Sequence, residues 1–193
     1  MLKYILLGFL NYQPMTGYDL KRLVDGSTAH FWHAYHSQIY TTLRKMEQEG
    51  LVTSVIDDSD EKLERRIYQI TEEGKSKLKQ WLGRPLTELP PSKDGLLVRL
   101  FFSGSRASQE VLNELRFQRQ LHQQQLELYQ QIKPEASAAQ SQVNSDLEEI
   151  RYGGRIDFDR EAKFWRMTLD LGVASEQMYL KWLDETIAKI ESF

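Results

Sequence analysis

Residues 36–52, HSQIYTTLRKMEQEGLV, join an amphipathic helix to the start of a strand. At about 100° per residue, Ile39, Leu43 and Met46 fall on one side of that helix. The other side carries mostly neutral hydrogen-bonding side chains, where glutamates and lysines would be usual on a solvated face. The stretch predicts a helix from about Ser37 to Glu49 that packs on one side and is chemically unusual on the other.

The outward side of this helix suits the reading of base edges in DNA. A recognition helix in the major groove needs side chains that donate and accept hydrogen bonds, mainly from its N-terminal turns. Tyr40 lies on the flank of this side, where its phenol could reach a phosphate oxygen. A solvated face would explain the same residues, so the neighbouring elements must distinguish the two interpretations. The outward residues are Ser37, Gln38, Thr41, Arg44, Lys45 and Gln48.

Two helices are expected before this stretch. The first begins at Leu2, with apolar residues at helical spacing, and ends ahead of Pro14. The second follows Thr16, which stands three residues before Asp19 in an approximate capping box. It breaks at Asp25-Gly26-Ser27.

A hairpin and a fourth helix are expected after the stretch. Gly50 is placed to end the third helix, and the β-branched runs 51–56 and 66–70 enclose a polar segment suited to a hairpin tip. Thr71 is placed to cap a helix that continues through about Leu82. Three helices, a hairpin and a further helix match a winged helix-turn-helix in both number and order.

The second half of the chain predicts helices alone. Residues 84–92 contain three prolines and are interpreted as a linker. The expected fold class is mainly α with a small β-hairpin: an N-terminal winged helix-turn-helix domain over residues 1–83 and a C-terminal α-helical domain over residues 93–193. The helices expected in the second half cover residues 94–102, 110–132, 135–151 and 158–190.

Composition narrows the classes of function. The chain of 193 residues contains no cysteine, which excludes thiol chemistry and fits a cytoplasmic protein. No apolar run approaches the length of a membrane span, and the N-terminus lacks the features of a signal peptide. No catalytic motif is found, so we expect neither an enzyme nor a cofactor. The formal charge of −3 leaves nucleic acid open, because residues 1–84 hold 12 Lys and Arg against 11 Asp and Glu.

Several separated motifs resemble the PadR family of bacterial transcriptional regulators. They cover nearly all of residues 1–82, and the helix layout that follows is similar to the α-helical C-terminal domain of members related to the virulence activator AphA. The resemblance implies a homodimeric repressor that binds a pseudo-palindromic operator in double-stranded DNA. The motifs are Met15-Thr16-Gly17-Tyr18-Asp19-Leu20, His36-Ser37-Gln38-Ile39-Tyr40, Glu49-Gly50-Leu51-Val52 and Tyr68-Gln69-Ile70-Thr71.

The resemblance also implies DNA-binding residues. The family commonly carries a basic tip on the wing, whereas residues 57–61 here read DDSDE, and phosphate would repel these four acids. We therefore expect contacts from the third helix and the returning strand of the wing. The expected residues are Ser37, Gln38, Tyr40, Thr41, Arg44, Lys45, Lys62, Arg65 and Arg66.

The C-terminal helices are expected to join two subunits, as the resemblance implies. Apolar residues recur along the last helix at spacings of mostly three and four. The expected dimerisation residues are Trp165, Leu169, Val173, Leu180, Leu183 and Ile187. A small-molecule effector of unknown identity is also considered, with Trp81, His122, Tyr129 and Trp165 as residues that could line its pocket.

Two alternatives stay open. A winged-helix module that binds proteins instead of an operator would fit the acidic wing and the negative net charge. A metal-dependent sensor would use His30, His33 and His36, whose intervals of three could bring imidazoles together. No cysteine or acid accompanies these histidines, so we assign no metal site and expect Phe31 and Trp32 to dock the segment on a core.

Overall fold

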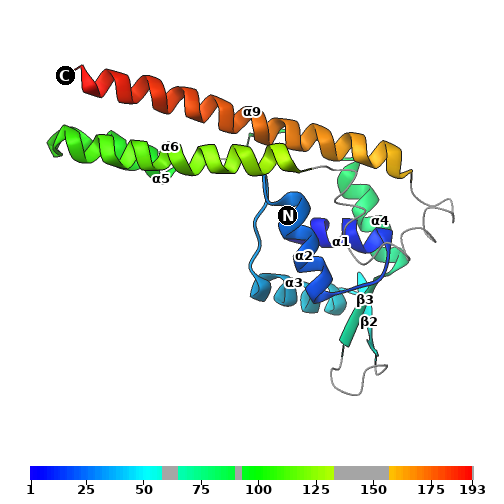
Figure 1. The fold of residues 1–193 in the computed structure, drawn as a ribbon. Coiled ribbons are helices and arrows are strands. Elements are labelled where there is room, and N and C mark those ends of the chain that lie inside the picture. Colours follow the sequence, from blue (N-terminus) through cyan, green and yellow to red (C-terminus); the bar gives the residue numbers. More distant parts are fainter. Residues whose placement is uncertain (58–64, 90–92, 133–156, 193) are drawn as a thin grey trace. The chain divides into compact units, whose positions relative to one another are not determined.

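The computed structural model describes residues 1–57, 65–89, 93–132 and 157–192 (Figure 1). The chain divides into two compact units. The first contains Met1–Leu86 with Pro134–Trp165, and the second contains Thr87–Lys133 with Arg166–Phe193.

The first unit is a winged helix-turn-helix, as predicted. A third strand, β1, was not predicted; it pairs with β3, so the sheet order is β1-β3-β2 with both pairs antiparallel. The second helix also does not stop at residue 25, because its last turn widens into a π-helix. The elements are α1 (Leu2–Tyr12), β1 (Met15–Thr16), α2 (Gly17–Leu23), the π-helical turn Val24–Thr28, α3 (His36–Gln48), β2 (Val52–Asp57), β3 (Arg65–Ile70) and α4 (Glu72–Leu82).

Local hydrogen bonds fix the ends of these helices. The Thr16 hydroxyl accepts the Asp19 amide at 3.1 Å while the Asp19 carboxylate accepts the Thr16 amide, which confirms the capping box. At the end of α3, Gly50 has φ +69°. Its amide donates to the Glu47 carbonyl, and the Leu51 amide donates to the Met46 carbonyl, as in a Schellman motif.

In the core of the first unit, the apolar side of each helix packs against the sheet. Leu6, Leu20, Leu43 and Met46 are fully buried there, and Tyr68 of β3 joins them. At the edge of this core, the partly buried Trp81 stacks on Tyr4 with ring centroids 4.4 Å apart. These contacts hold α3 by its apolar side and leave its other side outward.

The second unit is built from α5, α6 and most of α9. Its core contains Val111, Leu115 and Leu183. Arg116 pairs with Glu191 and Arg119 with Asp184, so α6 and α9 run antiparallel (Figure 1). The elements are α5 (Gly95–Phe101), the 3₁₀ turn Ser103–Ser105, α6 (Ser108–Gln131) and α9 (Phe158–Glu191), which begins in the first unit. The helix expected over residues 135–151 lies outside the described residues.

Candidate nucleic-acid interface

The outward side of α3 is the surface that the sequence singles out. The predicted division of the helix is confirmed: Ile39, Leu43 and Met46 are fully buried in the core. The first turn contains no acidic residue. The exposed residues on the other side are Ser37, Gln38, Thr41, Arg44, Lys45 and Gln48.

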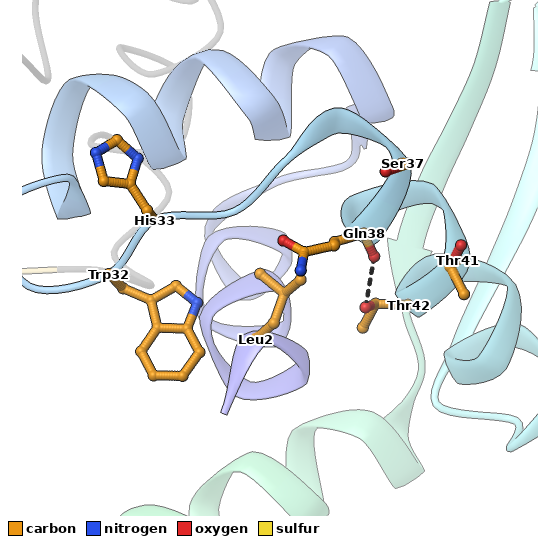
Figure 2. A pocket seen from close by; sticks show the side chains of 7 residues that line it. All are labelled: Leu2, Trp32, His33, Ser37, Gln38, Thr41 and Thr42. Atoms are coloured by element: carbon orange, nitrogen blue, oxygen red, sulfur yellow. Dashed lines mark hydrogen bonds between the residues drawn. The ribbon is translucent and has the colours of Figure 1, made fainter. Parts of the chain in front are cut away.

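Gln38 has a structural role beside its predicted DNA contact. Its Oε1 accepts a hydrogen bond from the Tyr35 amide at 2.9 Å, which satisfies a backbone donor at the start of α3. The Thr42 hydroxyl donates to the Gln38 carbonyl at 2.7 Å (Figure 2). The side-chain NH2 group of Gln38 is therefore the part of this residue that can donate a hydrogen bond to DNA.

Tyr40 lies on one flank of α3, packed against the start of α2. A Cβ atom at Gly17 would be 2.6 Å from Cζ of Tyr40, so only glycine allows the ring this position. The His36 ring lies 4.7 Å from it. Burial, followed by the charges of Tyr68 and Asp19, raises the pKa of Tyr40, so its phenol stays protonated and able to donate a hydrogen bond.

Glu47 of α3 contacts both strands of the wing, the β2–β3 hairpin. The Ser54 hydroxyl of β2 donates to the Glu47 carboxylate at 2.5 Å, and Arg66 of β3 lies 3.9 Å from the same group. Arg65 and Arg66 are exposed on β3. Lys62 and most of the acidic tip lie outside the described residues. Glu47, to which the sequence analysis assigned no role, thus positions the wing against α3.

Arg44 and Lys45 supply positive charge to the same face. Both are exposed, and in the described part of the chain no carboxylate pairs with either. Elsewhere in the first unit Lys3 is paired with Glu49 at 2.9 Å and Lys21 with Asp25. The two cations of α3 are thus available to phosphate.

The three histidines of residues 30–36 are not gathered into a group of metal ligands. Within residues 1–57, 65–89, 93–132 and 157–192, no three metal-ligating side chains lie close enough to hold an ion. Trp32 packs on the core as expected, whereas Phe31 is exposed and contacts the His30 ring edge-on.

Among the described residues, no helix combines the length and the apolar character of a membrane span.

A hollow of about 350 Å³ opens beside the N-terminal half of α3 (Figure 2). Three of its residues, Ser37, Gln38 and Thr41, belong to the predicted DNA-binding set. Sequence reasoning missed the hollow, because its other wall comes from α1 and from the segment before α3. The lining residues are Leu2, Trp32, His33, Ser37, Gln38, Thr41 and Thr42.

Most of the expected dimerisation residues pack within the chain itself. Leu169, Leu180 and Leu183 are buried, and Ile187 joins the core of the second unit. A different set of apolar residues is exposed on α5, α6 and α9. They are Leu97, Val98 and Phe101 on α5, Phe102 directly after it, Phe117, Leu121 and Leu128 on α6, and Phe164, Met167, Leu171 and Met178 on α9.

The four residues considered for a ligand are divided between the two units. Trp81 stacks on Tyr4, and Trp165 contacts the Tyr12 ring edge-on at 6.2 Å, both in the first unit.

In the second unit His122 stacks on Tyr179 at 4.0 Å and pairs with Glu176 at 2.5 Å. Tyr129 is buried there. Each of the four is thus already engaged in packing.

Each half of the chain matches a known family of protein domains. Residues 6–80 match the transcriptional regulator PadR-like family, and residues 92–191 match the domain described as virulence activator alpha C-term. The negative transcriptional regulator PadR of Bacillus subtilis is 27% identical over 191 residues, which cover 99% of this chain and 98% of that protein.

Solved structures also match nearly the whole chain. Bacillus subtilis PadR in complex with operator DNA gives a TM-score of 0.77 at 27% identity and 98% coverage of each chain. The virulence activator AphA of Vibrio cholerae gives 0.71 at 25% identity, covering 100% of this chain and 99% of that one. This chain therefore belongs to the PadR-like family of transcriptional regulators and carries a virulence activator alpha C-terminal domain in its second half.

Proposed function

We propose that this protein is a repressor that binds a pseudo-palindromic DNA operator as a homodimer, with α3 of each subunit in the major groove. The observation that carries the proposal is the outward face of α3, where hydroxyl and amide groups stand beside two cations without ion partners in the described chain. Serine, threonine and glutamine can read base edges, and arginine and lysine attract the phosphates. The family match and the operator complex of Bacillus subtilis PadR support this use of the helix.

The acid nearest to this face does not oppose the proposal. Glu47 lies on the flank of α3 that faces the wing, where Ser54 and Arg66 engage its carboxylate. A carboxylate occupied in this way repels phosphate less than one that projects toward the DNA. The positive charges of Arg44 and Lys45 then dominate the electrostatic potential that α3 presents to the DNA phosphates.

The exposed apolar residues of the second unit give the proposed homodimer its surface. On α9, Met167, Leu171 and Met178 follow one another at spacings of four and seven, directly opposite the buried stripe that contains Leu169. A stripe of this length in water marks an association surface. A second copy of the chain, using the same stripe, would bring two α3 helices into one molecule, as the two half-sites of a pseudo-palindrome require.

A mobility-shift series tests the proposal. Fragments from upstream of the gene itself and of its neighbours are titrated with the protein at several salt concentrations, with an unrelated fragment of equal length as control. We expect one fragment to bind more tightly than the control, with affinity falling as salt rises. Equal, weak binding to every fragment at low salt would instead favour the alternative of a protein-interaction module.

A further inference from the structure

The hollow beside α3 has walls from three separate parts of the first unit. Leu2 lies at the start of α1, Trp32 and His33 precede α3, and the remaining residues are on α3 itself. Gln38 and Thr42 fall on the flank of α3 that faces Trp32, while Ser37 and Thr41 face outward (Figure 2). The hollow therefore continues the outward face of the helix sideways, toward α1.

The lining contains hydrogen-bonding groups but no lysine, arginine, aspartate or glutamate. Hydroxyl groups come from Ser37 and Thr41, and an amide comes from Gln38. The indole nitrogen of Trp32 is turned toward Leu2 (Figure 2). Because the Trp32 ring is partly buried against the core, its N–H group is held in place before any partner arrives.

We propose that this hollow is a seat for the DNA sugar-phosphate backbone, in which the Trp32 indole N–H donates a hydrogen bond to a phosphodiester oxygen. The inference rests on the proposed function. When α3 lies in the major groove, a phosphate strand runs along each flank of the helix, and the hollow lies on one of those flanks. An N–H donor that is fixed in advance and meets an anionic oxygen forms one of the stronger hydrogen bonds available to a protein.

The uncharged indole gives this contact a measurable signature. A lysine or arginine that neutralises a phosphate releases counterions, so its loss reduces the slope of affinity against salt. An indole N–H carries no charge and releases none. Trp32 therefore contributes to affinity by the same factor at every salt concentration, and it fixes the position of the helix in the groove.

The test compares Trp32→Phe with wild type on the shortest upstream fragment that wild type binds. Phenylalanine keeps an aromatic ring against the core and removes only the N–H group and part of the ring. We expect operator affinity to fall about tenfold at each salt concentration with an unchanged salt slope. Trp81→Phe is the matched control, because Trp81 also packs on this core but stacks on Tyr4 away from the hollow; its affinity should stay as in wild type.

A methylphosphonate scan identifies the phosphate. Replacing single phosphates of the bound fragment by neutral methylphosphonates should reveal one position in each half-site that weakens wild type but not Trp32→Phe. Unchanged affinity of a folded Trp32→Phe, or the absence of such a position, overturns the inference and leaves the proposed function standing. Failure of wild type to bind any upstream fragment overturns the proposed function, and this inference with it.

Discussion

The carbonyl oxygen of Leu51 occupies the space that a side chain on Gly74 would need. A Cβ atom at residue 74 would lie 2.2 Å from this oxygen, well inside van der Waals contact. The same oxygen accepts the Thr71 amide at 3.0 Å, and the Thr71 hydroxyl donates to the carbonyl of Gly50 at 2.8 Å. The end of α3 and the beginning of α4 are thus joined backbone to backbone.

Replacing Gly74 by alanine should destabilise the first unit. The opposing atom is backbone, which cannot rotate away, so we expect a loss of about 2 kcal/mol or more in the free energy of unfolding. Gly8→Ala is the control, since nothing lies within 4 Å of a Cβ there and alanine favours the helix. Urea unfolding followed by circular dichroism measures both; equal midpoints for Gly74→Ala and wild type would contradict the described packing.

Removing the guanidinium of Arg44 should weaken operator binding and lower its salt dependence. With one cation fewer at the phosphates, the slope of log affinity against log salt should fall by about one unit. If Arg44 instead contacts a base, affinity should fall while the slope is kept and discrimination against mutated operators is reduced.

Lys75→Ala, on α4 and paired with Glu72, serves as a control for simple loss of charge. Wild-type affinity in Arg44→Ala would tell against the proposed orientation of α3.

Asp94 links the beginning of α5 to α9, and this link should depend on pH. Burial raises the pKa of its carboxyl, but the Tyr179 hydroxyl at 2.5 Å and the amides of Leu97 and Leu96 more than offset this, so the pKa is lowered. The resulting stability is present above the ordinary carboxyl pKa of about 3.9 and is lost as pH falls through the lower, folded value.

Asp94→Ala should cost about 1 kcal/mol at pH 7 through loss of the helix cap. The difference from wild type should shrink as the pH of thermal unfolding scans approaches 3. A difference that stays constant down to that pH would show that the charge of Asp94 contributes nothing to the link.

A charge in the middle of the exposed stripe of α9 should separate the proposed dimer. Leu171 is 69% exposed, so Leu171→Glu should leave the fold of one chain unchanged while placing a carboxylate in the subunit interface. Sedimentation velocity should then report a monomer. Gln177→Glu adds the same charge at an exposed position off the stripe and should remain dimeric; a dimeric Leu171→Glu would exclude this stripe from the interface.

Features that depend on neighbours in the sequence were predictable. The capping box at Thr16 and the glycine end of α3 follow from a few adjacent residues, and both are present. Strand β1 was missed because its two residues are extended only through pairing with Tyr68 and Ile67, far along the chain.

The last helix shows a second limit of sequence reasoning. Leu183 and Leu171 both repeat at helical spacing, yet one is fully buried in its own chain and the other is exposed. Periodicity identifies an apolar face without saying which neighbour covers it. The hollow at Trp32 was hidden for a similar reason, since its walls come from segments that only the tertiary structure brings together.

The separation of uncharged and cationic residues on α3 has a consequence for how such a regulator diversifies. Under the proposed function, Ser37 and Thr41 read sequence, while Arg44 and Lys45 supply general attraction to DNA. Substitutions at the first pair would redirect the protein to a new set of promoters without altering how quickly it scans the chromosome. A duplicated gene could therefore acquire different targets through one or two codons and remain a competent DNA-binding protein at every intermediate.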